Sequence, residues 1–322
     1  MLQRISNGVK SWSKAIHKAI LVLFLTLGAV ILRALVKIYN ALFINLKVQP
    51  DTIQFIPTGK ENDKHRIKLH IYRPKELRGP SPVLLTFCGS GFIIPGFGLD
   101  DPYCREISQQ TGHVVIDVQY RLAPEHPFPT ALEDAKRAID WVIGQPDLYD
   151  PAHISIGGFS AGANLAVSIA ANDYESHTFH SLIAFYPCVD AQTSPYRKKA
   201  LVSGRPAVGI GSVPPALMHF FQTCYLLGGG QANDPRVSPA LAAAMDRFPK
   251  NCLFVVASFD SLAKETLKLA KRLNTNDRHV RVYRAQGGGH AFDKAVQLGT
   301  EQYLMRQQAY DEVASILRRQ NS

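Results

Sequence analysis

The sequence of 322 residues predicts an α/β fold with a mostly parallel sheet flanked by helices. Short continuous runs of Val, Ile, Leu and Phe recur from residue 65 onward, as expected for strands buried on both faces. Amphipathic segments lie between these runs, and such alternation is typical of parallel sheets. Hydrophobic residues make up 46% of the chain and charged residues 19%, so a sizeable core is expected and a disordered chain is not.

Seven strands are predicted in chain order, and the segments between several of them have helical spacing. The strands are at residues 67–72, 83–87, 114–118, 154–159, 182–186, 253–257 and 280–283. The helices are at residues 131–143, 161–172, 262–274 and 295–318. The link between the first two strands is too short for a crossover helix, so we expect the sheet to begin antiparallel.

Residues 190–247 differ from the rest of the chain because they are rich in Pro and Gly and poor in strand patterns. A helix is predicted within them, near residues 216–227. The segment follows the strand at 182–186, and ligand sites in open parallel sheets lie at the carboxyl ends of the strands. We therefore interpret residues 190–247 as a cap over the site.

The N-terminal segment predicts a membrane anchor. Residues 19–32 carry no charge, and the apolar run continues to Val36 after the single interruption at Arg33. Residues 16–36 are long enough to cross a bilayer if Arg33 extends its side chain toward the headgroups. A cleaved signal peptide and a helix lying in the interface plane remain alternatives. We divide the chain into an anchor with a juxtamembrane segment, residues 1–50, and an α/β domain, residues 51–322.

The charge distribution supports a membrane rather than a nucleic acid as the partner. Residues 1–50 contain seven Lys and Arg and no acidic residue, so they carry +7 of the net charge of +10 and leave +3 for the rest. Such a basic excess beside an apolar run fits anionic lipid. Four of these residues precede the run and three follow it, which favours a lumenal position for the domain that follows the anchor. We expect a single-pass membrane protein.

A nucleophile is predicted where the strand at 154–159 meets the helix at 161–172. Gly158, Ser160 and Gly162 form a Gly-x-Ser-x-Gly motif at this junction. A sharp turn would expose the serine hydroxyl above the sheet, the glycines would relieve crowding, and the helix N-terminus would favour developing negative charge. The strand–turn–helix context makes the motif far more specific than the five residues alone.

A nucleophilic serine needs a base and an orienting acid, in the chain order Ser, acid, His for this arrangement. Asp260 follows the strand at 253–257, and His290 follows the strand at 280–283. Both would lie at the same sheet edge as Ser160. Other candidates are less directly placed after core strands: Asp234, Asp293, His219 and His279.

Several segments resemble the hormone-sensitive lipase family of α/β-hydrolases. Residues 120–129 read Tyr-Arg-Leu-Ala-Pro-Glu-His-Pro-Phe-Pro, which resembles the signature of that family, and residues 234–239 resemble a second segment. Asp260-Ser261-Leu262 resembles the segment around the family's catalytic acid. His290-Ala291-Phe292 resembles the segment around its catalytic base. The resemblance spans residues 65–318, and the N-terminal helix makes the layout similar to arylacetamide deacetylase-like membrane esterases.

One departure concerns the oxyanion hole. The family has His-Gly-Gly-Gly after an early strand, whereas this chain has Cys88-Gly89-Ser90-Gly91. The resemblance implies that the backbone amides of Gly89, Ser90 and Ala161 hold the oxyanion. If residue 90 requires a positive φ, serine would cost about 1 kcal/mol there.

The resemblance and the anchor imply a serine esterase that cleaves small apolar esters with short acyl groups. Such chemistry needs neither a metal nor an organic cofactor, and the five cysteines form no zinc-site spacing. An acyltransferase or eliminating enzyme with the same triad remains an alternative, as does a ligand-binding member without catalysis. Every chemical motif lies beyond residue 87, so we expect the anchor to be dispensable for activity.

Overall fold

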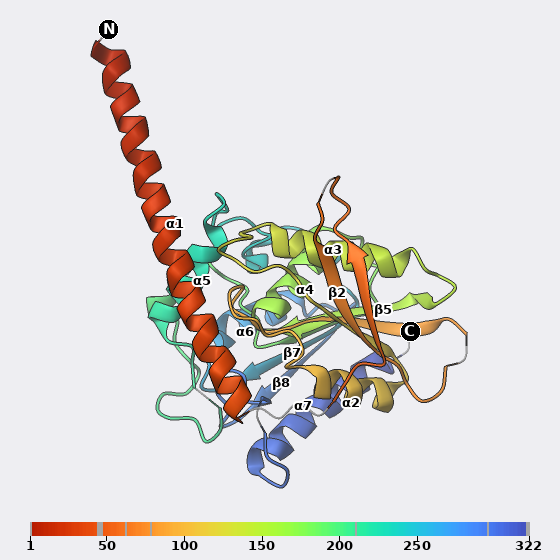
Figure 1. The fold of residues 1–322 in the computed structure, drawn as a ribbon. Helices are drawn as coiled ribbons and strands as arrows, with labels where there is room; N and C mark the ends of the chain where they lie inside the picture. The colour runs from red at the N-terminus through yellow and green to blue at the C-terminus, as the bar shows by residue number, and fades with distance from the viewer. Residues whose placement is uncertain are drawn as a thin grey trace.

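A twisted eight-stranded sheet forms the centre of the structure, a computed structural model that describes residues 2–43, 48–61, 63–77, 79–209, 211–294 and 296–319. The strand order in the described chain is β1-β2-β4-β3-β5-β6-β7-β8 (Figure 1). The strands are β1 (Thr52–Pro57), β2 (Arg66–Tyr72), β3 (Ser81–Phe87), β4 (Val114–Val118), β5 (Tyr149–Phe159), β6 (Ser181–Phe185), β7 (Asn251–Ala257) and β8 (His279–Ala285).

The strand directions confirm a mostly parallel sheet with an antiparallel start. β2 pairs antiparallel with β1 and with β4. From β4 through β8, neighbouring strands run parallel. β2 is not a neighbour of β3, the next strand in the sequence, because β4 lies between them in the sheet.

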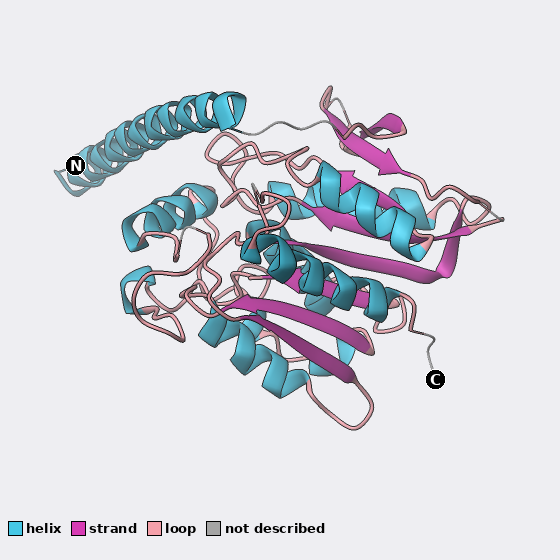
Figure 2. Cartoon of the chain, turned by 90° about the horizontal axis from the view of Figure 1, so that it is seen from below, coloured by secondary structure: helices cyan, strands magenta, loops and turns pink. Residues whose placement is uncertain are grey.

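Helices cover both faces of the sheet, as Figure 2 shows. The helices of the domain are α2 (Asp101–Thr111), α3 (Thr130–Ile143), α4 (Ala161–Asn172), α5 (Pro215–Leu226), α6 (Ala263–Leu273) and α7 (Glu301–Leu317). Side chains of α3, α4 and α6 join one buried cluster, while those of α2 and α7 join another across the sheet. The strands are nearly continuous apolar runs because both faces are covered.

The sequence patterns did not predict two of the elements, and the bounds of several others differ from the predicted ones. β1 and α2 were not expected, and the last helix begins at Glu301 rather than at residue 295. The described part of residues 190–247 contains α5 and three short 3₁₀ helices, at Pro195–Arg197, Pro239–Leu241 and Met245–Arg247. Parts of the expected domains lie outside the described residues, namely residues 1, 44–47, 62, 78, 210, 295 and 320–322.

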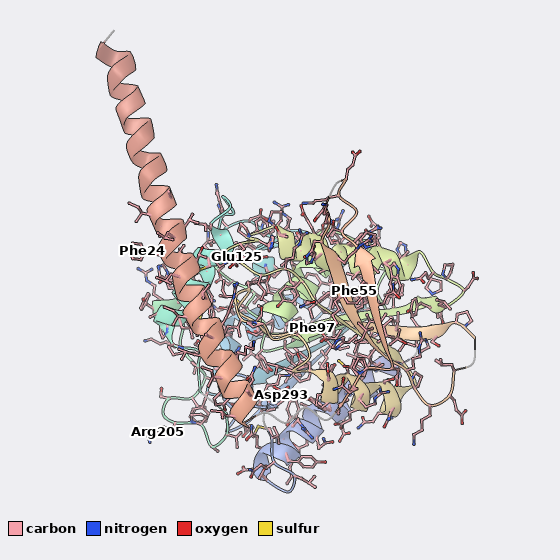
Figure 3. The ribbon with its side chains drawn as sticks, in the orientation of Figure 1. Phe24, Phe55, Phe97, Glu125, Arg205 and Asp293 are labelled. Atoms are coloured by element: carbon pink, nitrogen blue, oxygen red, sulfur yellow. The ribbon has the colours of Figure 1, made fainter. Side chains whose placement is uncertain are left out.

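The N-terminal segment forms one helix, α1 (Leu2–Phe43). Its stretch Ala19–Leu42 is long and apolar enough to cross a membrane, although a signal sequence passes the same test. Phe24 lies on its outer side, whereas Glu125 of the domain lies beside it (Figure 3). The expectation that Arg33 extends toward headgroups is wrong for this structure, because its guanidinium pairs with Glu125 at 2.8 Å.

His113, between α2 and β4, makes stability depend on pH. Burial lowers the pKa of His113 to about 4, against about 6.5 for an unfolded histidine. As the pH falls from about 6.5 to about 4, the unfolded state binds a proton at His113 and the folded state does not. The free energy of unfolding therefore decreases by about 1 kcal/mol per pH unit. We expect thermal unfolding at about pH 7 and about pH 5 to show a smaller shift in His113→Asn than in the wild type.

The exposed His219 provides the matched control for this experiment. His219→Asn should keep the pH dependence of the wild-type protein. An identical pH dependence in His113→Asn and the wild type would contradict the assignment.

Candidate active site

Ser160 lies on a strained turn between β5 and α4. Its φ of 51° and ψ of −112° place it in a region that side chains rarely adopt. The turn is closely packed, since a Cβ on Gly158 would lie 2.6 Å from the backbone of Gly162 and one on Gly162 would lie 2.0 Å from the carbonyl oxygen of Phe87. The two glycines therefore allow the strand and the helix to approach closely enough to expose the serine.

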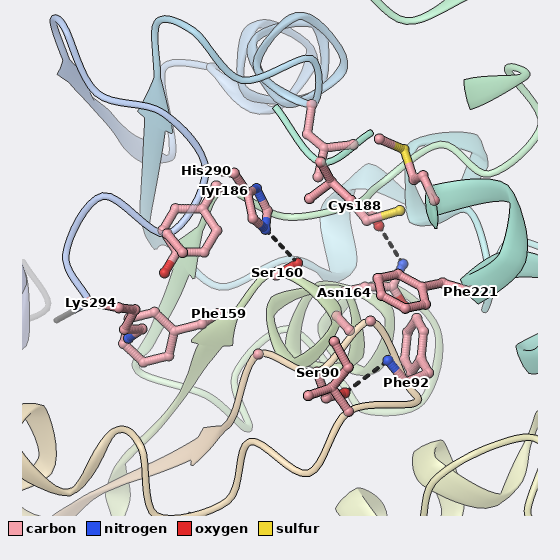
Figure 4. Close-up of a pocket in the computed structure, with 18 of the residues that line it drawn as sticks. Ser90, Phe92, Phe159, Ser160, Asn164, Tyr186, Cys188, Phe221, His290 and Lys294 are labelled. Atoms are coloured by element: carbon pink, nitrogen blue, oxygen red, sulfur yellow. Dashed lines mark hydrogen bonds between the residues drawn. The ribbon is translucent and has the colours of Figure 1, made fainter. Parts of the chain in front are cut away.

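The structure brings Ser160, His290 and Asp260 into one hydrogen-bonded chain. The Ser160 hydroxyl lies 3.0 Å from Nε2 of His290 (Figure 4), and Nδ1 of His290 lies 2.7 Å from Oδ2 of Asp260. The other carboxylate oxygen accepts a hydrogen bond from the backbone N–H of Leu262. Asp260 and His290 are buried, so little water competes with the carboxylate for the hydrogen bond to the imidazole ring. This arrangement polarises the serine hydroxyl toward a base.

The other candidate acids and bases are not part of this hydrogen-bonded chain. Asp234 pairs with Arg236. Asp293 accepts a hydrogen bond from the Tyr186 hydroxyl. His219 is an exposed residue of α5, and His279 is the first residue of β8, at the opposite end of that strand from His290.

Gly89, Ser90 and Ala161 also line the cavity above Ser160. The Ser90 side chain turns back into its own loop, where its Oγ lies 2.6 Å from the Tyr120 hydroxyl and accepts from the backbone N–H of Phe92. Positive φ angles occur at the next two residues, Gly91 and Phe92, and not at Ser90. The strain expected for a serine at position 90 is therefore absent.

A cavity of about 660 Å³ surrounds Ser160 and is lined mainly by apolar side chains. Figure 4 shows Phe92, Phe221 and Cys188 on one side of Ser160, with Phe159, Tyr186 and Lys294 on the other. In the described chain, the non-glycine residues with positive φ all line this cavity: Phe92, Ser160, Tyr186 and Ala291. Backbone strain of this kind concentrates at functional sites.

One wall of the cavity carries charge that the sequence did not indicate. Lys294 contacts Asp100 and Asp293, and its Nζ lies 3.4 Å from the centre of the Phe159 ring. Burial alone would lower the pKa of Lys294, but the two carboxylates hold it above its usual value. Lys294 lies four residues after His290 in the sequence, and no sequence motif indicates its partner Asp100.

Cys88 has no features of a nucleophile. Its thiol is buried, and burial raises its pKa well above the usual value. A thiol in that state is mostly protonated near neutral pH. Among the described residues, no group of three or more His, Cys, Asp or Glu side chains is placed to hold a metal ion.

Comparison with known proteins identifies the family. A family model described as alpha/beta hydrolase fold matches residues 84–294, more than half of the chain. The chain belongs to this family. The match confirms the expected α/β-hydrolase fold and supports the resemblance to the hormone-sensitive lipase family.

Individual α/β-hydrolases extend the comparison. An ethyl acetate hydrolase of Pseudomonas putida is 28% identical over 266 residues, 79% of each chain. The carboxylic ester hydrolase LipN of Mycobacterium tuberculosis is 31% identical over 253 residues, 76% of this chain and 64% of that protein. The structure of EstE1, a carboxylesterase from a metagenomic library, superposes with a TM-score of 0.75 at 27% identity and covers 90% of this chain and 98% of its own.

Proposed function

We propose that this α/β-hydrolase is a serine-dependent carboxylic-ester hydrolase. The observation that carries the proposal is the hydrogen-bonded chain from Ser160 through His290 to Asp260 at the floor of an apolar cavity. Relatives with the same fold include an ethyl acetate hydrolase and carboxylesterases, which supports the same class of reaction.

In the proposed mechanism, Ser160 Oγ attacks the ester carbonyl carbon as its proton passes to Nε2 of His290. The tetrahedral adduct collapses, the bond to the leaving oxygen breaks, and His290 returns the proton to the departing alcohol. Water then attacks the acyl-enzyme, with His290 as base, and releases the acid and the free serine. Asp260 holds the imidazole with Nδ1 protonated and stabilises the imidazolium.

The oxyanion would be held by the backbone N–H groups of Gly89, Ser90 and Ala161. These three residues line the cavity beside Ser160, and Ala161 is the first residue of α4, where the helix dipole favours negative charge. The Ser90 hydroxyl is engaged by Tyr120 and the Phe92 amide, so we assign the donor role at position 90 to the backbone.

We propose that the substrates are small apolar esters with short acyl groups. The apolar lining of the cavity supports an apolar substrate, because burial of such surface drives binding. The ethyl acetate hydrolase among the relatives supports a short acyl group. The cap role of residues 190–247 is part of the proposal, and Met218 and Phe221 of α5 line the cavity.

We also propose that α1 attaches the protein to a membrane, that of the endoplasmic reticulum, with the catalytic domain on the lumenal side. The apolar stretch Ala19–Leu42 and the +7 charge of residues 1–50 support attachment. The assignment of this membrane and this side rests on the sequence resemblance and the order of basic residues.

A substrate series tests the proposed activity. The detergent-purified protein should be labelled by a fluorophosphonate probe and should hydrolyse p-nitrophenyl acetate and butyrate faster than the decanoate. The Ser160→Ala protein should lose both the label and the activity, since no hydroxyl remains to attack. Adding excess alcohol and analysing the products separates hydrolysis from acyl transfer.

Absence of labelling in the folded wild-type protein would contradict the proposed nucleophile. Efficient formation of a new ester at the expense of the free acid would favour an acyltransferase. A faster reaction with the decanoate would contradict the short-acyl assignment while leaving the esterase in place.

A further inference from the structure

The middle of α1 packs directly against the catalytic domain. Leu25 and Ala29 are buried in one cluster with Ile93, Ala123 and Cys224. The approach to α5 is close, because a Cβ added at Gly28 would lie 3.2 Å from the Phe220 ring. Although the outer face of α1 is exposed, this inner face is therefore part of the folded domain.

The guanidinium of Arg33 stabilises the contact between α1 and the domain through its charge and its planar shape. Its Nε donates to the carbonyl oxygen of Ile93 at 2.9 Å, and Nη2 donates to that of Ala123 at 2.7 Å. Both terminal nitrogens also reach the Glu125 carboxylate at 2.8 Å. A planar guanidinium can satisfy a carboxylate and two carbonyls at once, whereas a lysine ammonium presents a single point charge.

Ile93 belongs to the same tight turn as the proposed oxyanion donors. The backbone N–H groups of Ile93 and Ile94 both donate to the Ser90 carbonyl oxygen, at 3.0 and 2.8 Å. The Phe92 N–H donates to the Ser90 hydroxyl. Arg33 thus holds one end of a hydrogen-bonded turn whose other end carries the amides of Gly89 and Ser90.

The same contact reaches the wall of the cavity through α5. Phe221 lies against the turn, since a Cβ at Gly91 would be 2.4 Å from its ring. Tyr225 stacks on Phe92 with ring centres 3.7 Å apart. Phe221, Phe92 and Tyr225 all line the cavity. Displacement of α1 would therefore loosen the oxyanion turn and the cap helix together.

We propose that α1 is a strap that holds the turn of residues 89–94 together with α5, and that Arg33 is a positioning residue for ester hydrolysis. This inference rests on the proposed esterase function and replaces the expectation that the anchor is dispensable for activity. Arg33 acts through the turn of residues 89–94 and does not contact the hydrogen-bonded chain at Ser160. Its loss should therefore weaken transition-state stabilisation more than substrate binding.

The test uses the full-length protein in detergent and compares Arg33→Ala, Arg33→Lys and Glu125→Gln. We expect Arg33→Ala to lower kcat roughly 10-fold with KM changed less than about twofold, because the amides are misplaced rather than removed. Arg33→Lys should recover only part of this loss. Glu125→Gln should lower kcat by a smaller factor, since both carbonyl contacts of Arg33 persist.

Inhibition by phenylboronic acid provides a readout that a purely structural role would not move. The boronate forms a tetrahedral adduct with the serine, so its Ki should rise by the same factor as kcat falls. Lys37→Ala is the control, because Lys37 is exposed one helical turn beyond Arg33 and its removal also deletes a positive charge from α1. This variant should behave as the wild type.

Unchanged kcat and Ki in Arg33→Ala would overturn the inference, as would an equal loss in Lys37→Ala. If Arg33→Ala does not fold, unchanged kcat and Ki in both Arg33→Lys and Glu125→Gln would overturn it. Hydrolysis by the wild-type protein tests the proposed function separately. An active wild-type protein with unchanged kcat and Ki in Arg33→Ala would therefore contradict the strap and leave the esterase function in place.

Discussion

Ester hydrolysis will fall by roughly 10³–10⁴-fold or more in kcat when His290 is replaced by alanine or Asp260 by asparagine. Without the imidazole, Ser160 has no base. With asparagine at 260, the side chain that orients the ring and stabilises the imidazolium loses its charge. Steady-state kinetics on p-nitrophenyl acetate measures the effect, and circular dichroism verifies the fold.

Asp234→Asn and His279→Ala are the matched controls for these variants. Asp234 pairs with Arg236, and His279 lies at the far end of β8, so both should retain kcat within a few-fold. Near-normal turnover in Asp260→Asn together with collapse in Asp234→Asn would transfer the acid role to Asp234.

The second large effect is expected for Gly162→Ala. Its Cβ would lie 2.0 Å from the Phe87 carbonyl oxygen and 2.5 Å from that of Cys88. These are rigid backbone atoms, so α4 must move away from the end of β3. Overpacking of this kind costs about 1–3 kcal/mol or more. Because the shift separates Ala161 from Gly89, we also expect kcat to fall roughly 10²-fold.

Gly144→Ala is the control for this substitution. Gly144 ends α3 with a φ of −71°, and a Cβ there would be 3.3 Å from its nearest neighbour. Differential scanning fluorimetry and kinetics should show little change. Wild-type melting temperature and kcat in Gly162→Ala would mean that the Ser160 turn tolerates a wider separation than its packing indicates.

Much of the parallel sheet follows from sequence because its strands are buried on both faces. β4 and β6 are buried at every position, and apart from Asp117 in β4 and Ser181 at the start of β6 they consist of apolar residues. β1 has no such pattern, since it is an edge strand with exposed Ile53 and Phe55. α2 is short and polar, although the proline at its start is a helix signal that could have located it.

The candidate site was predictable to the extent that it follows from the ends of strands. Ser160, Asp260 and His290 each follow a strand, and parallel strands bring their carboxyl ends to one edge. The contacts between Ser90 and Tyr120, and between Arg33 and Glu125, join residues 30 and 92 positions apart. No local pattern encodes such pairs, because they depend on how loops and helices pack after the sheet has formed.

The docked position of α1 limits how deeply this helix can enter a bilayer. Ala19–Leu42 would extend about 36 Å at 1.5 Å per residue, enough for a hydrocarbon core of about 30 Å. However, the contacts from Leu25 to Arg33 fall within this stretch, and only residues 19–24, about 9 Å, precede them. Full crossing and docking therefore exclude each other.

In the docked state, the exposed Leu27, Ile31 and Leu35 form an apolar side of α1 beside α5, which the proposed membrane attachment would place against one leaflet. A protein held in this way would meet its ester in the lipid phase. Its rate would then follow the mole fraction of substrate in that leaflet rather than the concentration in water.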